Sequence, residues 1–523
     1  MEHIAEALKR PEAYPHPTGT IEVVETHISW IFLTESYAYK VKKPLNLGFL
    51  DFSTLEKRLH YCNEELRLNQ RLCPEIYLSI VPVVKSATSI CIDGDGEIID
   101  YAVKMVRFDR TMELDRLLSS GKLTTMHIDI LAHLIAGFHQ GIAAVKPETG
   151  FGHPDNLIKP ILDNFAHTEP VASNSDEVSR LEILKAWTVT EHQRLYSLFL
   201  KRQQHGCIRQ CHGDMHTGNM VWWKNQIFIF DCIEFNENLS IIDVISDLAF
   251  LYMDLEHSEQ PALASRLLNN YLKETGDYGA MPLLRFYAVY RAMVRAKVTA
   301  IRYVQTEDKL LGERVLEEHF SYLRLAEHFT RKQRPLLILT MGVSGSGKTT
   351  LSSEIAQSIQ GVHIRSDIER KRLAGLKALD RSDDARKTSI YSDDMGRQTY
   401  KKLLDLASLC IEEGLTVIVD ATFLKVTNRK LFIELAQRLN CPCRILNFNA
   451  PREVLVERIQ KRYLMGNDAS DADTSVLAAQ LDNQEALSKE EDAISISINT
   501  SEAVDLEAIT KVLRMKTGMR EED

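Results

Sequence analysis

The residues best suited to chemistry lie in the segment GVSGSGKT, residues 342–349. It fits the pattern G-x-x-x-x-G-K-[ST], follows the apolar run LLILTM and precedes a helix-like segment, as a phosphate-binding loop requires. Glycines let backbone N–H groups wrap phosphates, the lysine neutralises the β and γ phosphates, and the threonine hydroxyl can bind magnesium. The loop predicts nucleotide contacts from Gly342, Gly345, Gly347, Lys348, Thr349 and Thr350, with Thr349 also bound to Mg2+.

Two carboxylates follow later strand-like runs of the same region. HIRSD brings Asp367 to the carboxyl edge of the expected sheet, where α/β proteins bind ligands, and a carboxylate there can accept a proton from an acceptor hydroxyl. Asp367 could instead cap the following helix. TVIVDAT places Asp420 where it suits the magnesium shell or the acceptor. Because no guanine-reading N-K-x-D sequence occurs, ATP is the expected nucleotide.

A lid-like segment follows at ERIQKRYLMGNDASDAD, residues 457–473. Arg458 and Arg462 lie four residues apart and therefore on one face of a helix, from which they could stabilise charge on a transferred phosphoryl group. A solvent-exposed salt bridge is the alternative for both. The pattern favours catalysis for Arg462 and leaves both readings open for Arg458.

A second set of polar residues lies in HGDMHTGN, residues 212–219. The segment resembles the catalytic loop H-R-D-x-x-x-x-N of protein kinases, with aspartate and asparagine at the same spacing. The resemblance implies that Asp214 orients and deprotonates an acceptor hydroxyl and that Asn219 holds a magnesium ion. The strand-like IFIFD then supplies Asp231 as the second magnesium-binding residue.

The same resemblance extends to the N-terminal part of the chain. AYK is similar to the A-x-K of the kinase β3 strand, which makes Lys40 the phosphate-binding lysine and Glu65 its ion-pair partner. Lys42 shares the strand face of Lys40 and is a rival, because side chains alternate with period two. No G-x-G-x-x-G precedes Lys40, only TGTIEVVETHIS, so the sequence leaves open how this lobe would cover phosphates.

Other polar groups near these motifs have alternative readings. His212 could be a structural histidine in a tight turn, and Cys207 and Cys211 beside it could suggest a metal, although the catalytic-loop reading already accounts for the histidine. Three cations of a later helix could bind a phosphorylated acceptor, but such charges more often pair or face solvent: Arg291, Arg295 and Lys297.

The order of elements predicts two domains. Strand-like runs and one helix fill residues 20–108, and a mainly helical region follows, which is the order of the two lobes of a kinase. After the charged stretch 326–335, apolar runs of strand length alternate with amphipathic helices, as in a parallel sheet wrapped by helices. We expect a protein-kinase-like, bilobal α+β domain at 1–330 and an α/β P-loop kinase domain at 336–523.

These motifs resemble known families over nearly the whole chain. HGDMHTGN with the following aspartate resembles the aminoglycoside phosphotransferase family, and GVSGSGKTT, IRSD and VIVDAT resemble the P-loop kinases that include gluconate kinase, zeta toxins and polynucleotide kinase. Two-domain proteins with this combination and with YKVKKPLNLGFLDFSTLEKR are similar throughout. The resemblance implies phosphoryl transfer to a hydroxyl, with acceptors that range from sugars to nucleic-acid ends.

Composition excludes several other classes. At 523 residues the chain exceeds one typical core, and a formal net charge of -10 gives no global attraction to nucleic acid or anionic membranes. No apolar stretch reaches membrane-spanning length, and nine scattered cysteines fit a reducing compartment, so we expect a cytoplasmic protein without membrane association.

Two functional hypotheses follow from these observations. The first is a bifunctional ATP-dependent phosphotransferase with two separate Mg-ATP sites and hydroxyl acceptors, either small molecules or nucleic-acid ends. The alternative is a P-loop kinase or ATPase, of polynucleotide kinase or toxin-like type, regulated by a degenerate kinase-like sensor domain. The missing glycine loop favours the alternative, and the retained Asp214, Asn219 and Asp231 oppose it.

Overall fold

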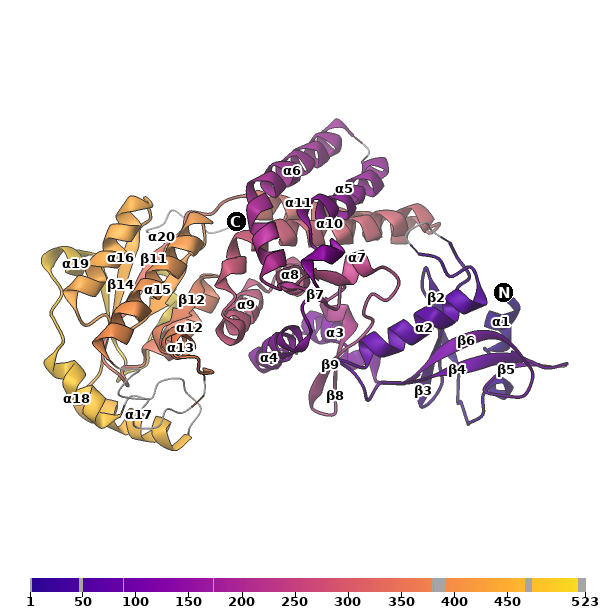
Figure 1. Ribbon diagram of the computed structural model, residues 1–523, viewed down its shortest axis with the longest axis horizontal. Coiled ribbons are helices and arrows are strands. Elements are labelled where there is room, and N and C mark those ends of the chain that lie inside the picture. Colours follow the sequence, from indigo (N-terminus) through magenta and orange to yellow (C-terminus); the bar gives the residue numbers. More distant parts are fainter. Residues whose placement is uncertain are drawn as a thin grey trace. The chain divides into compact units, whose positions relative to one another are not determined.

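The computed structural model describes residues 2–46, 50–87, 89–172, 174–378, 380, 392–465 and 473–515 (Figure 1). The chain divides into two compact units. Unit 1 comprises Met1–Asp254 and Tyr290–Phe320, and unit 2 comprises Leu255–Val289 and Ser321–Asp523.

Unit 1 begins with a six-stranded antiparallel sheet in the order β1-β2-β3-β6-β4-β5. Alternating apolar and polar residues predict these strands, and the structure has them at the expected positions. Their bounds are β1 (Glu22–Glu25), β2 (Ser29–Leu33), β3 (Tyr37–Lys42), β4 (Tyr77–Lys85), β5 (Ile90–Ile92) and β6 (Glu97–Val106).

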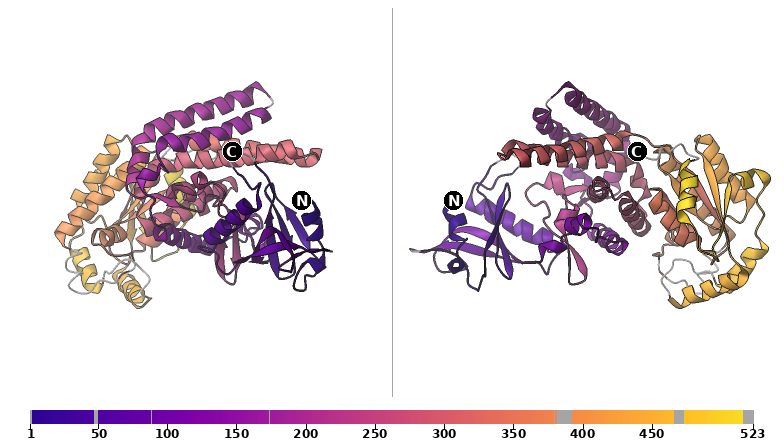
Figure 2. Two further views of the ribbon diagram at one scale, coloured as in Figure 1. Left: turned by 45° about the vertical axis from the view of Figure 1, so that its right-hand side comes forward. Right: turned by 180° about the vertical axis from the view of Figure 1, so that it is seen from behind.

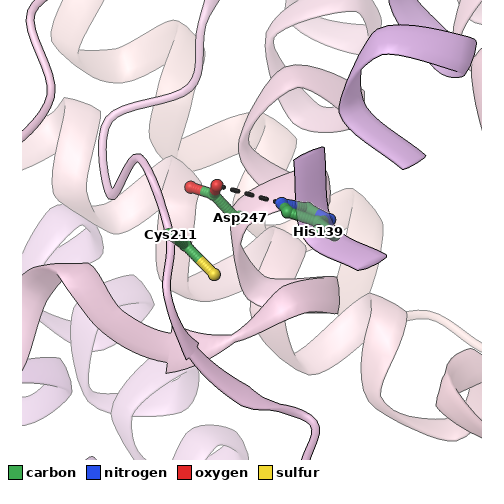
Figure 3. Close-up of side chains that lie close together, drawn as sticks. All are labelled: His139, Cys211 and Asp247. Carbon is green, nitrogen blue, oxygen red and sulfur yellow. Dashed lines mark hydrogen bonds and ion pairs between the residues drawn. The ribbon is translucent and has the colours of Figure 1, made fainter. Parts of the chain in front are cut away.

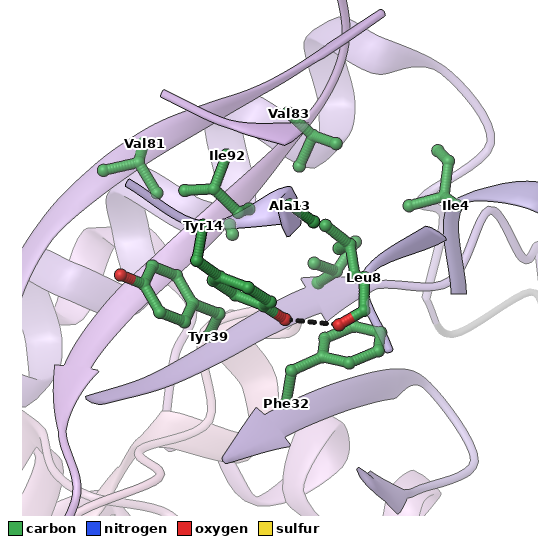
Figure 4. Packing of buried hydrophobic residues seen from close by; sticks show 11 residues of the cluster. Ile4, Leu8, Ala13, Tyr14, Phe32, Tyr39, Val81, Val83 and Ile92 are labelled. Carbon is green, nitrogen blue, oxygen red and sulfur yellow. Dashed lines mark hydrogen bonds between the residues drawn. The ribbon is translucent and has the colours of Figure 1, made fainter. Parts of the chain in front are cut away.

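The N-terminal segment, with α1 (Glu2–Ala7), packs against this sheet. Ile4, Leu8 and Tyr14 join buried residues of the strands in one hydrophobic cluster (Figure 4). The Tyr14 hydroxyl donates to the backbone oxygen of Leu8 at 2.6 Å, which satisfies the polar end of a buried ring. Residues before the first strand are therefore part of the core of this lobe.

Helix α2 (Leu55–Asn69) packs on β4 and β6 and belongs to the same lobe. Thr54 caps its first turn by accepting from the backbone N–H of Lys57. Arg71, just beyond the helix, donates to the backbone oxygens of Gln210 and Cys211, at 2.6 and 3.2 Å. The helix that carries Glu65 is thus fixed to the strand that leads into the predicted catalytic loop.

The rest of unit 1 is mainly helical. Helices α5 and α6 run side by side as a hairpin (Figure 2). The short strands β7 and β10 pair, as do β8 and β9, and flank the HGDMHTGN loop. The limits of the units fall within α8, α10 and α11. The elements are α3 (Leu114–Ser119), α4 (Thr125–Gly141), α5 (Pro154–Thr168), α6 (Ser175–Gln204), β7 (Ile208–Gln210), β8 (Met220–Trp223), β9 (Gln226–Ile229), α7 (Glu237–Ser240), β10 (Ile241–Asp243), α8 (Val244–His257), α10 (Met281–Gln305) and α11 (Lys309–Thr330).

Unit 2 is built on a five-stranded parallel sheet in the order β12-β13-β11-β14-β15. Its central strands are buried along their whole length, which matches their near-continuous apolar sequence. The strands are β11 (Leu337–Met341), β12 (Val362–Arg365), β13 (Val417–Asp420), β14 (Cys443–Asn449) and β15 (Ser495–Asn499).

Helices connect and surround these strands (Figure 1). They include α9, which precedes β11 by more than sixty residues yet packs on α12 and β12. Gly276 ends α9 in the left-handed conformation, with φ of 72°. The helices are α9 (Pro261–Thr275), α12 (Lys348–Ser358), α13 (Ser366–Leu373), α15 (Asp393–Glu412), α16 (Val426–Arg438), α17 (Arg452–Met465), α18 (Thr474–Asp482), α19 (Lys489–Ala493) and α20 (Leu506–Met515).

Among the residues that the structure describes, none of the helices combines the length and the apolar character that a membrane span needs.

Candidate functional site

The first site centres on an ion-pair cluster in unit 1. Lys40 Nζ lies 2.8 Å from Glu65 Oε1 and 2.6 Å from Asp231 Oδ1. The Lys40 and Glu65 side chains are almost fully buried, whereas that of Asp231 is 46% exposed. Burial acts to lower the pKa of Lys40, but the two carboxylates outweigh it and raise that pKa. The three residues predicted at distant positions in the chain therefore meet, with Asp231 open to solvent.

Lys42 occupies a different environment from Lys40. Its ammonium group is wholly buried between Glu65, at 2.6 Å, and Glu234. Burial and the Glu65 charge raise the pKa of Glu234, against the opposing effect of Lys42. A cavity lies next to this ion-pair cluster, and Lys40 lines it whereas Lys42 does not. The geometry thus distinguishes the two lysines that the sequence left as rivals. Lys40 lines the cavity, and Lys42 forms a buried ion pair with Glu65.

Asp214 and Asn219 lie together in the HGDMHTGN loop. The Asn219 amide donates to the backbone oxygen and to Oδ2 of Asp214, both at 3.0 Å. His216 Nε2 lies 3.5 Å from the same Oδ2. Removal from water acts to raise the pKa of Asp214, but His216 and the charge of Arg295 lower it below its ordinary value. Asp214 is therefore ionised, as a general base must be before it accepts a proton.

Two buried groups fix the backbone of this loop. The Asp247 carboxylate accepts from the backbone N–H groups of His212 and Gly213, at 3.0 and 2.9 Å. Arg291 donates to the backbone oxygen of Gly213 at 2.9 Å and to that of Ser246 at 3.0 Å. Asp247 thus binds two backbone N–H groups of the loop, and Arg291 binds one of its backbone oxygens. Together these residues of α8 and α10 set the position of Asp214.

A possible metal-binding group lies beside this anchor. His139, Cys211 and Asp247 are buried and place one ligand atom each within 4.8 Å of one another (Figure 3). However, Asp247 already accepts from His139 Nε2 at 3.2 Å and from two backbone N–H groups. Burial and the nearby Asp247 charge also raise the pKa of the Cys211 thiol, which opposes thiolate formation. These contacts indicate a structural hydrogen-bond group.

The backbone at Asp231 is strained. Its φ is 66°, in the left-handed region that non-glycine residues rarely adopt, and such strain is concentrated at functional sites. The Asp231 carboxylate and the Asn219 side-chain oxygen are hard donors of the kind that Mg2+ prefers. The two residues predicted to bind magnesium here thus fit the ion by their donor chemistry and by the exposure of Asp231.

A cavity of about 300 Å3 adjoins this cluster. Its walls are mainly apolar, with Ile31, Ala38, Tyr77 and Met105 from the sheet side, and Lys40 and Asp231 are among the residues that line it. This combination of apolar walls and few polar groups is typical of a small-molecule site. The β1–β2 turn that borders it contains no glycine; Thr26 closes it by accepting from the N–H of Ser29 at 2.9 Å.

The second site lies in unit 2, in a cavity of about 590 Å3 at the carboxyl ends of β11 and β13. Gly342 has φ of 144°, and a Cβ atom there would lie 2.6 Å from the backbone oxygen of Phe448, so only glycine fits. Gly347, with φ of 81°, begins α12 and directs the N-terminus of the helix at the loop. The cavity is lined by Gly345, Gly347, Lys348, Thr349, Thr350, Asp367, Asp420 and Arg462, among others.

Lys348 is folded onto its own loop. Its ammonium group donates to the backbone oxygen of Val343 at 2.8 Å and lies 3.4 Å from the hydroxyl of Ser346. Burial lowers its pKa, while the charges of Asp420 and Asp367 oppose that effect. A lysine in this state gains a stronger partner when phosphate enters the loop.

Asp420 ends β13 and is buried against β12. Its Oδ2 lies 3.3 Å from His363 Nε2 and 3.9 Å from Arg365 Nε, but makes no aligned hydrogen bond with any described residue. Burial acts to raise the pKa of Asp420; His363, Arg365 and Lys348 outweigh it and lower that pKa. An ionised, incompletely bonded carboxylate beside Thr349 fits a magnesium ion, which takes oxygen ligands.

Asp367 lies in the first turn of α13 and lines the same cavity. The helix begins after Arg365, and no side chain caps it, so Asp367 does not serve as the cap that the sequence left possible. Its carboxylate lies 3.2 Å from Arg370 and is 27% exposed. It is therefore accessible from the cavity, on the β12 side of the phosphate loop.

The two arginines of the lid-like segment have different contacts. Arg458 donates to the backbone oxygens of Gly345 and Thr500, at 3.3 and 2.6 Å, and so ties the loop to the end of β15. Arg462 lines the cavity, and its charge acts on Lys348. The DASDAD part of the predicted lid lies outside the described residues, apart from Asp473, which caps α18.

Several residues of both sites are absent from the sequence-based predictions. Asp247 and Glu234 act on the first site from α8 and the loop after β9, and no motif marks them. The sequence suggested Arg291 only as a possible contact of an acceptor, whereas it binds the backbone of the catalytic loop. In the second site, the side-chain oxygen of Gln480 in α18 accepts from the backbone N–H of Ser344 at 2.7 Å. A buried ionisable residue next to a known motif is a weak signal, since many such residues have purely structural roles.

Comparisons with known proteins match two separate stretches of the chain, and the first of them extends from unit 1 into residues 255–284 of unit 2. Residues 60–284 match the model of the phosphotransferase enzyme family, and residues 337–487 match that of an AAA domain. An uncharacterized protein of Mycobacterium tuberculosis (strain ATCC 25618 / H37Rv) is 28% identical over 464 residues, which cover 88% of this chain and 90% of that protein. An uncharacterized protein of Mycobacterium bovis matches equally.

Two solved structures are similar to part of this chain. A choline/ethanolamine kinase family protein of Mesorhizobium loti covers 62% of this chain and 98% of its own, with 11% identity and a TM-score of 0.37. A gluconokinase of Sinorhizobium meliloti 1021 covers 34% and 89%, with 20% identity and a TM-score of 0.24. The chain joins a kinase-like domain of the phosphotransferase enzyme family to a P-loop domain of the kinase type, as the sequence motifs predict.

Proposed function

We propose that the protein is a bifunctional ATP-dependent phosphotransferase with two separate Mg-ATP sites and hydroxyl acceptors. The observation that carries the proposal is that each unit has its own lysine, its own magnesium-type oxygen ligands and its own candidate base. In unit 1 these are Lys40, Asn219 with Asp231, and Asp214. In unit 2 they are Lys348, Thr349 with Asp420, and Asp367.

In unit 1 we infer that Asp214 accepts the proton of the acceptor hydroxyl as that oxygen attacks the γ-phosphorus, while the bond from the γ-phosphorus to the β–γ bridging oxygen breaks and ADP leaves. His216 and Asn219 hold the carboxylate in place, and Lys40 neutralises phosphate oxygens. Magnesium, when bound at Asn219 and Asp231, would neutralise charge on the phosphates. In unit 2, Asp367 would play the part of the base and Arg462 would stabilise charge on the transferred group.

The acceptor of unit 1 is proposed to be anionic. Asp214 is flanked by His216, and Arg295 lies one helical turn beyond Arg291, which contacts Gly213. Arg291 contacts backbone oxygens and a hydroxyl instead of a carboxylate. A polycation such as an aminoglycoside would meet repulsion at this end of the site, whereas a phosphorylated or carboxylated alcohol would be attracted.

The alternative, a P-loop enzyme regulated by a kinase-like sensor, has one observation in its favour. The β1–β2 turn around Thr26 is short and lacks glycine, so unit 1 has little backbone with which to enclose phosphates. The position of Asp214, held by Asn219 and next to His216, favours catalysis, since a sensor needs no positioned base.

Counting nucleotide sites separates the two hypotheses. Calorimetry of the full chain with a non-hydrolysable ATP analogue and Mg2+ should give two binding events. Lys348→Ala should remove one event, because this lysine neutralises the charge of the β and γ phosphates. Asp231→Ala should weaken the other event, because a magnesium ligand is lost. A single event that vanishes in Lys348→Ala would contradict the bifunctional proposal. All four tryptophans lie in unit 1, so a change in their fluorescence would report its site independently.

A further inference from the structure

Strand β12 lies at the edge of the sheet of unit 2, where β13 is the one strand among the described residues that pairs with it. On the β13 side, Val362 N–H donates to the backbone oxygen of Thr416 at 2.8 Å. The alternate residues, Gly361 and His363, direct their backbone groups to the other side, as the geometry of a strand requires. At an ordinary sheet edge these groups would be left to solvent.

The side chain of Asn269 occupies this outer side of β12. Its amide nitrogen donates to the backbone oxygen of Gly361 at 2.9 Å, and its oxygen accepts from the N–H of His363 at 2.7 Å. One amide thus satisfies a donor and an acceptor of the strand, as a neighbouring strand would. Asn269 lies in α9, and both α9 and β12 belong to unit 2.

A second contact from the same segment holds the next element. The backbone oxygen of Lys273, near the end of α9, accepts from Arg372 of α13 at 2.9 Å. Helix α13 carries Asp367 in its first turn. The segment 261–275 therefore contacts both β12 and α13, which border the acceptor side of the phosphate loop.

His363 connects Asn269 with the predicted magnesium ligand. While its backbone N–H is held by Asn269, its Nε2 lies 3.3 Å from Oδ2 of Asp420. Arg365, two residues further on the same strand face, pairs in register with Asp420 and lies 3.9 Å from the same oxygen. A shift of β12 along its axis would move the His363 ring and the Arg365 guanidinium relative to that carboxylate.

We propose that Asn269 is a positioning residue of the P-loop site, which acts through His363 on Asp420 and so sets the magnesium affinity of that site. The proposal rests on the proposed nucleotide-binding function of unit 2. It assigns a part in that site to a helix that lies within the match to the phosphotransferase family, residues 60–284, and outside the match to the AAA domain.

The test titrates magnesium into the full chain at a fixed concentration of the ATP analogue and measures binding of the analogue. The binding that remains in Lys348→Ala is subtracted, and the difference is the contribution of unit 2. Asn269→Ala should require about 10-fold more Mg2+ for half-maximal binding, since loss of a group that orients a metal ligand typically costs 10–100-fold in metal affinity. Binding of the analogue without Mg2+ should not change. Arg266→Gln is the matched control, because Arg266 lies on the same helix but contacts Gln357 of α12.

Two further variants keep the result decisive if Asn269→Ala does not fold. Asn269→Asp can still accept from His363 but cannot donate to Gly361, so a smaller shift in the same direction is expected. His363→Gln should reproduce the shift, and the double variant Asn269→Asp/His363→Gln should show no additional effect, because the two residues act in series. Unchanged magnesium dependence in Asn269→Asp, or a fully additive double variant, would overturn the inference. Absence of any Lys348-dependent binding in the wild type would instead refute the proposed function.

Discussion

Lys40 Nζ lies 2.6 Å from Asp231 Oδ1, although the two residues are 191 positions apart in the chain. The contact joins the sheet of unit 1 to the strained residue after β9. A nucleotide phosphate would compete with Asp231 for Lys40, and a magnesium ion would compete with Lys40 for Asp231. We therefore expect nucleotide binding at unit 1 to depend on Mg2+, because the metal must replace the lysine at the aspartate.

Lys40 and Lys42 should differ sharply when replaced. Lys40→Ala should weaken nucleotide binding at unit 1 with a modest loss of stability, since Glu65 keeps Lys42 as its partner. Lys42→Ala should cost about 3–5 kcal/mol, because it leaves the buried Glu234 without its lysine. Denaturant unfolding followed by tryptophan fluorescence, and analogue binding to folded protein, measure the two effects. Equal losses of binding in both variants at equal stability would contradict these roles.

Asp214→Ala should abolish phosphoryl transfer by unit 1 while nucleotide binding stays nearly unchanged. A positioned base contributes about 100- to 10,000-fold in rate and little to nucleotide affinity. A transfer screen with γ-labelled ATP, run in the Lys348→Ala background to silence unit 2, provides the measurement. His133→Gln, a substitution on α4 away from the catalytic loop, serves as the control. Full transfer in Asp214→Ala would remove the catalytic assignment.

Arg295→Gln should weaken binding of an anionic acceptor to unit 1. Its charge lowers the pKa of Asp214, and an anion beside Asp214 would need that charge as a counterion. In the same screen, KM for phosphorylated or carboxylated alcohols should rise about 10-fold, while KM for neutral alcohols stays the same. Arg302→Gln, which also pairs with Glu318, is the control. Preferential transfer to polycationic acceptors by the wild type would contradict an anionic acceptor.

Much of this fold follows from local sequence patterns. The strand at residues 37–42 and the loop at 342–349 are found where the alternation of apolar residues and the glycine spacing predict them. Asp231 could be placed because the strand before it ends in a recognisable motif. The motif also indicated Lys40, but only the structure distinguishes it from Lys42, because alternation puts both side chains on one face and only their contacts, Asp231 against Glu234, tell them apart.

Long-range contacts could not be predicted in this way. The amphipathic pattern of residues 261–275 indicates a helix but not the core that it joins, and nothing in the sequence links Asn269 to β12. Asp247 lies in an apolar helix, where a carboxylate gives no sign of the backbone groups that it binds. Such contacts depend on tertiary structure, which one sequence does not encode in any short pattern.

Asp367→Asn should suppress transfer by unit 2 and preserve ATP affinity. The carboxylate lies on the β12 side of the cavity and is held by Arg370 instead of by the phosphate loop. Asparagine keeps the shape but cannot accept a proton, so the rate per bound ATP should fall about 100-fold or more. Calorimetry and labelled-phosphate transfer in the Asp214→Ala background measure both quantities. If affinity collapsed while transfer per bound ATP stayed normal, Asp367 would be a nucleotide or metal residue.

The Lys40–Glu65–Lys42 cluster should make the stability of unit 1 sensitive to acid. Burial acts to raise the pKa of Glu65, but the two lysines outweigh it and lower that pKa from 4.5 to about 2. Because the folded pKa lies below the unfolded one, the cluster contributes fully above about pH 4.5, and its contribution declines as the pH falls toward 2. Glu65→Gln removes this titration, so its unfolding free energy should fall less between about pH 5 and about pH 3.5 than that of the wild type.

Tryptophan fluorescence during denaturant unfolding measures this difference in unit 1, which holds all four tryptophans. Other carboxylates with lowered pKa values, such as Asp214 and Asp247, titrate in both proteins and cancel in the comparison. Glu234 has the opposite sign, since its raised pKa makes protonation easier in the folded state. Because the Glu65 charge is one cause of that raised pKa, this opposing contribution is smaller in Glu65→Gln and reduces the expected difference. Identical slopes of unfolding free energy against pH in wild type and Glu65→Gln would show that the cluster is not ionised as its geometry indicates.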